Sequence, residues 1–425
     1  MARRKKYKNI YSKKNRKTSF WKISLVIVGL FVITLVGYAV SGPLLKFING
    51  ELSYNPADDP KPSSDTSQST EDESEDPLSD QNSGGKTDAT LQEQENIPQK
   101  DDKTTESLSL SEIKGVFMPT SILLDDALFN EFVTQASEKG FDSIVFELKD
   151  SAGHINYDSQ NESVITAGAK IGNPVDLKVR TQIIKDAGIN PIAKIYAFQD
   201  SVSSFVFPDA CVWYQAEGTR WVDNYIDRGG KPWLNPESLV AQTYIKEIAL
   251  EIVDSGVDKI IVDGIMYPTG VALELAYYGE RSKTDKFGVL NDFSKDMEKA
   301  LGDKGGMFIP MFSALTLLND NPMQYGGNPL KTDVSSIGVS IYPGTITDPL
   351  DFDGEVISVP ASMPRDTTAL IVKAILKNSP KPQKNILPFI QYYDGYENGD
   401  YASQIEILEE NNIFCYVLYN EQGVY

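Results

Sequence analysis

The stretch KIIVDGIMYP, residues 259–268, decides the fold prediction because it joins a buried strand to a charged end. Ile260, Ile261 and Val262 form a continuous apolar run, which is typical of a fully buried strand. Asp263 follows at once, and a carboxylate is costly to bury without a partner. The stretch therefore favours a fold in which the centre of a strand is buried while its carboxyl end reaches water.

Similar apolar segments recur along the chain and are mostly separated by amphipathic helical patterns. We expect strands at residues 115–120, 143–149, 190–198, 259–265, 307–314, 335–343, 385–391 and 413–419. We expect helices at 125–140, 175–188, 236–256, 367–377 and 402–412 and one around 293–302, with Pro236 in the first turn of the helix at 236–256. The segment GHINYD, 153–158, predicts a hairpin after the second strand.

This alternation predicts an α/β fold, a (β/α)8 TIM-like barrel over residues 113–425. An open doubly wound sheet is the alternative, but it usually carries a Gly-rich phosphate loop after its first strand, and MPTSILLDD at 118–126 has none. Active sites of TIM barrels lie at the carboxyl ends of the strands. Asp263 is then expected at the wet mouth of the barrel, where a carboxylate is an ordinary component of a site.

The chain before the barrel divides into three parts. Residues 1–22 are rich in Lys and Arg and predict a cytoplasmic tail. Residues 23–45 are long and apolar enough for an uncleaved transmembrane helix that acts as a signal anchor. Residues 46–112 are rich in Ser, Asp, Glu and Pro and predict a disordered acidic linker. We therefore expect a single-pass protein of the cell membrane with its carboxyl-terminal domain outside the cell.

Charge and cysteine content exclude several classes of protein. The net charge is −20 although the tail is basic, so the body is strongly acidic, which argues against a nucleic-acid partner. Two cysteines make no disulfide framework, and we expect Cys415 to be a buried free thiol. The single histidine, His154, excludes a His-rich zinc site and is expected at the surface of the hairpin. We expect no cofactor.

Polar and aromatic side chains follow most of the predicted strands, as expected for a site at the mouth. Alternation places Glu147 and Lys149 on one face of the second strand. Aromatic platforms with amides and carboxylates suit a sugar, which has apolar faces and a rim of hydroxyl groups. The expected substrate-binding residues are Lys149, Lys194, Tyr196, Trp233, Asn235, Tyr267, Tyr342, Gln391, Tyr392 and Asn420.

Asp263, Glu147 and Asp150 are the candidate catalytic carboxyl groups, because glycoside hydrolysis usually needs a pair of them. Asp263 is the candidate nucleophile or charge stabiliser. Each acid also has a structural interpretation: Asp263 or Glu147 pairs with Lys149 or Lys194, and Asp150 caps a turn. The tryptophans of the long loop after the third strand, Trp233 among them, either stack on sugar rings or pack within the loop.

Several motifs in order resemble one known family. They are FELKDSAGHINYDS, NPIAKIYAFQD, GGKPWLNPES, VDGIMYP, DVSSIGVSIYPGT, ILPFIQYYDG and SQIEILEENNIFCYVLYNEQGVY. Together they resemble the putative glycoside hydrolase domain family, formerly a domain of unknown function, which is often anchored to Gram-positive membranes. The resemblance covers roughly residues 113–425 and implies a TIM-like barrel.

The resemblance carries over residue by residue, with departures. Glu147 stands where the family usually has Asp, Met266 where an Arg usually follows the fourth strand, and Gly344 where Ser-His usually follows Tyr-Pro. The fifth strand, MFIPMFSALT, lacks the family's acid. The positions that match the family are Lys149, Asp150, Asp158, Asn235, Asp263, Pro268, Tyr342, Pro343 and Gln391.

Two functions stay open at this point. The first is a membrane-anchored glycoside hydrolase that acts outside the cell on cell-wall or environmental polysaccharide. The second is a non-catalytic glycan-binding barrel at the cell wall. Retention of Glu147, Lys149 and Asp263 favours the enzyme, whereas Met266 and the acid-free fifth strand favour the binding module.

Overall fold

The computed structural model describes residues 110, 113–215, 218–381, 383–392 and 399–425. The expected cytoplasmic tail, the expected transmembrane helix and nearly all of the expected linker lie outside the described residues. Within the described residues, no helix combines the length and the apolar character that crossing a membrane requires.

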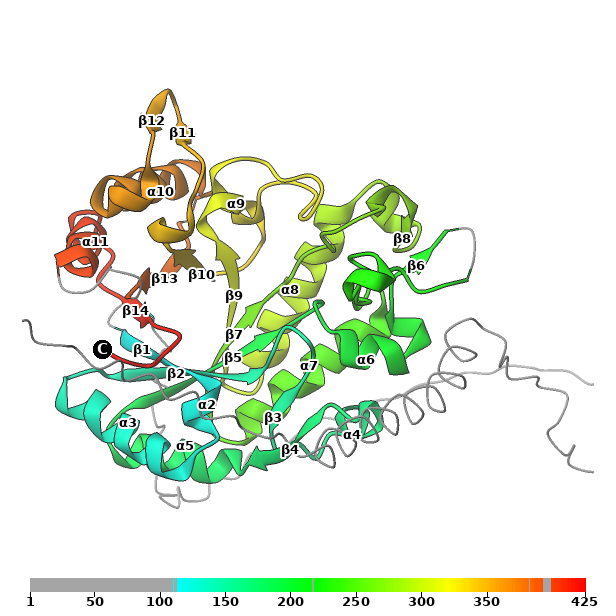
Figure 1. Cartoon of the computed structure of the whole chain (residues 1–425), viewed down its shortest axis with the longest axis horizontal. Helices are drawn as coiled ribbons and strands as arrows, with labels where there is room; N and C mark the ends of the chain where they lie inside the picture. Colours follow the sequence, from blue (N-terminus) through cyan, green and yellow to red (C-terminus); the bar gives the residue numbers. More distant parts are fainter. Residues whose placement is uncertain (1–109, 111–112, 216–217, 382, 393–398) are drawn as a thin grey trace, which may run out of the picture. The chain divides into compact units, whose positions relative to one another are not determined.

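Eight parallel strands close into a barrel, as the sequence predicts (Figure 1). Hydrogen bonds run from β1 through β14, β13, β10, β9, β7 and β5 to β2, and β2 pairs with β1 to close the ring. All eight pairings are parallel. The strands are β1 Lys114–Met118, β2 Ser143–Lys149, β5 Asn190–Tyr196, β7 Lys259–Asp263, β9 Met307–Ser313, β10 Ser336–Ile341, β13 Asn385–Gln391 and β14 Tyr416–Tyr419.

Helices lie outside this ring and pack on the outward face of the strands (Figure 1). The apolar stripe of α3, for example, buries Phe129, Phe132 and Val133. Asp125 caps the first turn of this helix by accepting hydrogen bonds from the N–H groups of Ala127 and Leu128. The helices are α2 Thr120–Leu123, α3 Asp126–Glu138, α4 Glu162–Ala167, α5 Leu177–Asp186, α6 Ser201–Val206, α7 Leu239–Asp254, α8 Lys286–Gly302, α9 Ala314–Leu318, α10 Pro364–Asn378 and α11 Gly399–Glu410.

Short strands decorate the ring. The expected hairpin forms, because β3 pairs antiparallel with β2 and in turn pairs with β4. Two small antiparallel sheets join β6 to β8 and β11 to β12. These strands are β3 Ile155–Tyr157, β4 Lys170–Val175, β6 Trp213–Tyr214, β8 Ala276–Tyr277, β11 Leu350–Phe352 and β12 Glu355–Ile357.

The first turns of α7 and α8 differ from the sequence prediction. Pro236 does not lie in the first turn of α7, because Ser238 is the N-cap and accepts a hydrogen bond from the Ala241 N–H. The side chain of a serine satisfies a first-turn donor, whereas proline only tolerates that position. The helix expected around 293–302 is α8, which begins earlier, at Lys286, because Asp285 caps it by accepting from the Gly288 N–H.

The barrel interior and the layer between strands and helices form two separate apolar cores. Most of the strands contribute one or two inward-facing residues to the interior core, among them Val145, Ile192, Ile261 and Leu387. Cys415 also lies there as a buried free thiol, as predicted. Because successive strand residues alternate between the two cores, the residues two positions after these apolar ones point into the mouth.

Candidate active site

Alternation along three neighbouring strands delivers the charged side chains to the mouth. On β5, Ile192 fills the barrel interior and Lys194 follows two residues later on the same face. Ile261 and Asp263 repeat this relation on β7. Strand register then places Glu147 of β2 directly opposite Lys194. The sequence prediction that Asp263 lies at the barrel mouth is therefore consistent with its place at the end of β7.

Two carboxylates share the Lys194 ammonium. Lys194 Nζ lies 3.0 Å from Glu147 Oε2 and 3.3 Å from Asp263 Oδ2, and 3.7 Å from the centre of the Tyr196 ring. The side chain of Lys194 is 7 % exposed, compared with 18 % for Glu147 and 27 % for Asp263. A buried ammonium is costly without a partner, so the two acids stabilise Lys194 in this position. The pairing of both acids with a lysine is thus observed, and the lysine is Lys194.

The environment shifts the pKa values of these groups in different directions. Burial raises the pKa of Glu147, against the opposing effect of the Lys194 ammonium. Burial alone would lower the pKa of Lys194, but the charge of Asp263, followed by Tyr196 and Glu147, outweighs it and raises that pKa. Burial raises the pKa of Tyr196 to about 12. Lys194 is therefore charged at neutral pH, and the Glu147 carboxyl is shifted toward holding a proton.

A cavity of about 260 Å³ opens beside the charged groups. Tyr342, which follows β10, and Tyr419, which ends β14, stack with ring centres 5.0 Å apart and an interplanar angle of 21°. Tyr342 is among the predicted substrate-binding residues, and Tyr419 ends the strand predicted at 413–419 and shares the inward face with Val417 of the interior core. The lining residues are Lys194, Tyr196, Asp263, Met311, Phe312, Ser313, Ser340, Tyr342, Phe389 and Tyr419.

The shared lysine limits the distance between the two carboxylates. Because Glu147 Oε2 and Asp263 Oδ2 lie 3.0 Å and 3.3 Å from one Nζ atom, their separation cannot exceed the sum of these distances. This limit, which applies to the two contacting oxygens, includes the roughly 5 Å spacing of retaining glycosidases. The two contacting oxygens therefore lie close enough for the carboxyl groups to act as a pair.

Lys149 does not lie on the mouth face with Glu147, so this prediction is wrong. Its side chain is fully buried, and Nζ lies 2.9 Å from Asp200 Oδ2 and donates to the Tyr196 carbonyl oxygen. The alternation fails because the β2–β5 register shifts between Glu147 and Lys149. A β-bulge of this kind turns the following side chain to another face.

Asp150 acts as a turn cap in the hairpin between β2 and β3, as its structural interpretation expects. Its Oδ1 accepts from the N–H groups of Ala152, Gly153 and His154, and its Oδ2 contacts His154 Nδ1 at 3.0 Å. Burial opposes ionisation, but the hydrogen bonds from His154 and Ala152 outweigh it and lower the pKa of Asp150. A carboxylate with these partners is poorly suited to give or take a proton during catalysis.

Trp233, Asn235 and Tyr267 are buried within the long loops that follow β5 and β7. The Trp233 indole, 2 % exposed, donates to Asp223 Oδ2, and Asn235 Nδ2 donates to the Tyr278 carbonyl oxygen. The Tyr267 hydroxyl lies 2.6 Å from Ser282 Oγ. These placements fit the self-packed interpretation of the loop, because none of the three presents a free face to a sugar.

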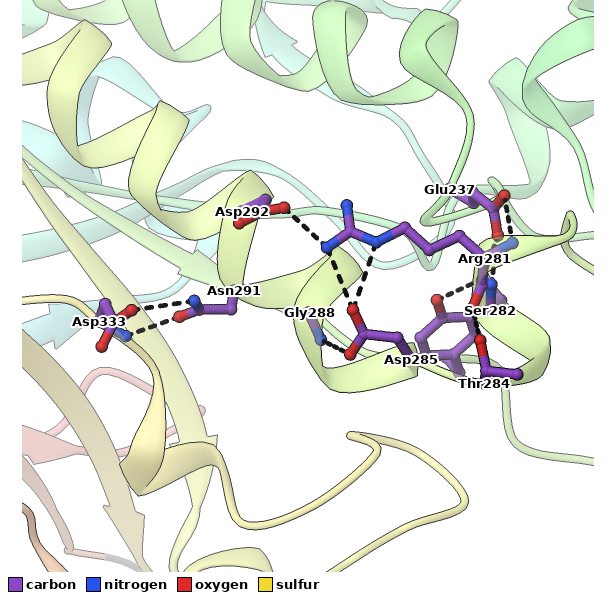
Figure 2. A network of polar contacts seen from close by, with 10 residues as sticks. Glu237, Arg281, Ser282, Thr284, Asp285, Gly288, Asn291, Asp292 and Asp333 are labelled. Atoms are coloured by element: carbon purple, nitrogen blue, oxygen red, sulfur yellow. Dashed lines mark hydrogen bonds and ion pairs between the residues drawn. The ribbon is translucent and has the colours of Figure 1, made fainter.

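A polar network joins the two loops and explains this burial. Glu237, which precedes α7, accepts from the N–H groups of Arg281 and Ser282 (Figure 2). Arg281 in turn reaches Asp285 and Asp292 of the segment that begins α8 (Figure 2). The network fixes one loop against the other, so the aromatic residues between them serve packing.

Gln391, Tyr392 and Asn420 support the loops around the last two strands. The Gln391 Oε1 accepts from the Gly344 N–H at 2.8 Å, and Asn420 Nδ2 donates to the Tyr392 carbonyl oxygen. The Tyr392 ring packs against Tyr401 and Tyr425. None of the three lines the cavity described above.

Metal-ligating side chains are not clustered in the part of the chain that the structure describes, where no group of three or more His, Cys, Asp or Glu residues is placed to hold an ion.

Comparison with protein families identifies the barrel. The family described as "Putative glycosyl hydrolase domain" matches residues 115–425. The chain belongs to this family. The resemblance predicted from its motifs is therefore confirmed, and the domain is glycoside hydrolase-like. Comparison with curated proteins gives no match.

Solved structures that resemble the chain include glycoside hydrolases. A hypothetical protein from Ruminiclostridium thermocellum has 22 % identity over 46 % of this chain and 96 % of its own, with a TM-score of 0.41. The glycoside hydrolase domain of PelA from Pseudomonas aeruginosa has 11 % identity over 74 % and 96 %, with a TM-score of 0.39. An α-galactosidase from Thermus thermophilus has 11 % identity over 74 % and 59 %, with a TM-score of 0.46.

Proposed function

We propose that the barrel hydrolyses glycosidic bonds with retention of configuration at the anomeric carbon. The observation that carries the proposal is the contact of Glu147 and Asp263 with one ammonium, Lys194, beside a cavity with stacked tyrosines. Two close carboxyl groups and an aromatic wall are what a retaining glycosidase needs.

The two acids take different roles in this proposal. Glu147 is the more buried of the two, and burial raises its pKa, so it gives a proton to the leaving oxygen. Asp263 is more exposed and attacks the anomeric carbon to form a glycosyl ester. Glu147 then removes a proton from the water that hydrolyses this ester. Lys194 keeps its own proton and orients both carboxylates before the sugar enters.

A glycan-binding barrel without catalysis is the second candidate. Met266 favours it, because this residue replaces the cationic residue that the family resemblance leads us to expect, and its sulfur lies 3.5 Å from the Tyr325 hydroxyl. The shared pairing with Lys194 also favours it, because a tightly paired carboxylate is a poorer nucleophile.

A screen of the full chain in detergent against a panel of polysaccharides separates the two candidates. Binding and the release of reducing ends are measured on the same panel, and the anomer formed first is identified by NMR. Retention of configuration is the expected result. Binding without release supports the second candidate, and an inverted product contradicts the roles given to Glu147 and Asp263.

We also propose that the domain acts outside the cell on cell-wall or environmental polysaccharide, held to the membrane by residues 23–45. The support is the order of a basic segment, an apolar segment and an acidic segment in the sequence. Protease added to intact protoplasts is expected to remove the barrel domain. Protection of residues 113–425 would contradict this topology.

A further inference from the structure

The ion pair between Lys149 and Asp200 is the most deeply buried one at the carboxyl ends of the strands. Both side chains have no exposed surface, and Nζ lies 2.9 Å from Oδ2. Lys149 also donates to the Tyr196 carbonyl oxygen, while Asp200 Oδ1 accepts from the Ser203 N–H at the start of α6. A buried ion pair seldom stabilises a fold more than an apolar pair of the same shape, so the pair calls for another explanation.

Lys149 lies at an irregularity in β2. Glu147 is opposite Lys194, but Lys149, two residues later, is opposite Ile195, only one residue later on β5. Asn156 of β3 donates to the Glu147 carbonyl oxygen at this point. In a regular strand, Lys149 would share the face of Glu147 and its ammonium would reach the mouth.

The β2–β3 turn is built around Asp200. Gly153 adopts φ +104°, and a Cβ atom on it would lie 2.0 Å from Asp200 Oδ1, so only glycine fits there. The N–H groups of Ser201 and Val202 donate to the Ala152 carbonyl oxygen. The turn and the β5–α6 loop thus enclose the carboxylate from two sides, which fixes where Lys149 finds its partner.

We propose that Asp200 is a positioning residue that holds Lys149 out of the mouth, so that Lys194 rather than two lysines balances Glu147 and Asp263. The effect of this positioning of Lys149 on catalysis rests on the proposed function. Released from Asp200, Lys149 would reach for Glu147, the acidic residue of its own strand. A second ammonium there favours ionised Glu147 and removes the proton that the leaving oxygen needs.

The titratable groups around Glu147 allow this effect to be recognised. Lys194 and Tyr196 face it from β5, Asp263 from β7, Asp150 from the β2–β3 turn and Tyr419 from β14. Tyr244 of α7 faces Asp200. In an Asp200 variant these groups are unchanged, so a new shift in the titration of Glu147 is attributable to the movement of Lys149.

The test compares Asp200→Asn with the double variant Lys149→Met/Asp200→Asn in the full chain. Asparagine retains an oxygen to cap α6 and removes only the charge. The first readout is acetylation of Lys149 by an amine-reactive ester, followed by mass spectrometry. In the unmodified protein Lys149 is expected to react slowly, and in Asp200→Asn at least about tenfold faster, because the ammonium has moved to the wet mouth.

The second readout is the pH dependence of kcat/KM. Hydrolysis requires protonated Glu147, so activity falls as pH rises through the pKa of Glu147. In Asp200→Asn, the midpoint of this alkaline limb is expected to move down by about one pH unit or more, because a new opposite charge nearby lowers the pKa of a carboxyl group by about that amount. The double variant lacks the mobile ammonium, and its alkaline limb is expected to return toward that of the unmodified protein. The exchange Lys246→Met/Asp296→Asn, at a surface ion pair between α7 and α8, is the control.

Three outcomes decide the proposal. Unchanged acetylation of Lys149 in a folded Asp200→Asn overturns it, as does a double variant whose alkaline limb stays shifted. If Asp200→Asn shows no cooperative unfolding transition, Asp200→Ser replaces it, because serine also caps the helix and leaves space for water beside Lys149. If the unmodified protein hydrolyses no glycan, the proposed function fails, but the acetylation result still decides whether Asp200 holds Lys149.

Discussion

The two ends of the barrel contain cavities of comparable size but different chemistry. The mouth cavity, about 260 Å³, places a lysine between two carboxylates and beside stacked tyrosines. The cavity at the amino ends of β13 and β14, about 360 Å³, also contains a lysine, Lys384, but its ammonium donates to the carbonyl oxygens of Thr332 and Val334. Burial lowers the pKa of Lys384, whereas Asp263 and its neighbours raise that of Lys194 against the effect of burial.

The partners of a buried charge therefore identify a site better than the volume of a cavity does. At the amino ends, backbone carbonyls satisfy the hydrogen bonds of the lysine. At the mouth, side chains that are able to exchange protons satisfy it, and they stand beside open space. Perturbed acids in a cleft are the stronger indication of function. The predictions below test this contrast.

Asp263→Asn is expected to have the largest effect on the mouth. Asparagine has the same shape but cannot attack the anomeric carbon, so turnover should fall by more than the roughly 10²–10⁴-fold typical of lost acid–base catalysis. Glycan binding should be nearly unchanged, because the charge acts mainly in the transition state. Hydrolysis rates and binding titrations check this. Full turnover in the variant would remove Asp263 from the mechanism.

Glu147→Gln is expected to lower turnover by about 10²–10⁴-fold, because the leaving oxygen loses its proton donor. Aryl glycosides with acidic leaving groups need less protonation and should be affected less. Because burial raises the pKa of Glu147, the unmodified enzyme should lose activity as pH rises through that raised value, and the variant should lack this limb. The pH dependence of kcat/KM, measured for both proteins, shows whether the variant has lost this decrease in activity at high pH. Equal losses for all leaving groups would assign Glu147 a different role.

Tyr419→Ala is expected to weaken glycan affinity by about tenfold, with a small change in kcat. The variant removes one of two stacked rings, and aromatic packing of this kind contributes about 0.5–1.5 kcal/mol beyond buried area. Phe414→Ala, an exposed aromatic residue at the amino ends of the strands, is the matched control and should leave affinity unchanged. Calorimetric titration checks both. Equal losses for the two variants would mean that the mouth is not the binding surface.

Lys384→Met is expected to have the smallest functional effect. It leaves two carbonyl oxygens without their donor, so the free energy of unfolding should fall by about 1–3 kcal/mol while turnover is unchanged. Denaturant titration and a rate measurement on the same sample check this. If turnover falls and stability does not, the contrast between the two ends is wrong.

Residue patterns predicted much of the barrel without tertiary information. Each expected strand overlaps an observed one, because apolar runs and alternation depend on local geometry and on which faces are buried. The position of Lys194, Tyr196 and Asp263 at the ends of predicted strands also predicted that they lie at the mouth together. Helix starts were less accurate, since the caps at Ser238 and Asp285 depend on side-chain contacts that several residues in each segment could offer.

Pairing between distant residues determined the rest of the candidate site. Alternation alone places Lys149 beside Glu147, but the β2–β5 register shift sends it to Asp200. Nothing local to Trp233 or Tyr267 distinguishes a sugar platform from a packed ring, and their burial results from contacts between two long loops. Tyr419 joins the site because closure of the barrel brings β14 beside β13 and β1.

The sequence by itself therefore determined the strand order along the chain and the location of Asp263 at a strand end, because apolar runs and helical patterns alternate along the chain. It also determined the inward faces, because side chains alternate along a strand with a period of two residues. The tertiary structure decided which lysine meets which acid. That choice depends on a bulge, a glycine turn and the register between strands, and the free energy of a buried charge depends on partners that are far away in sequence.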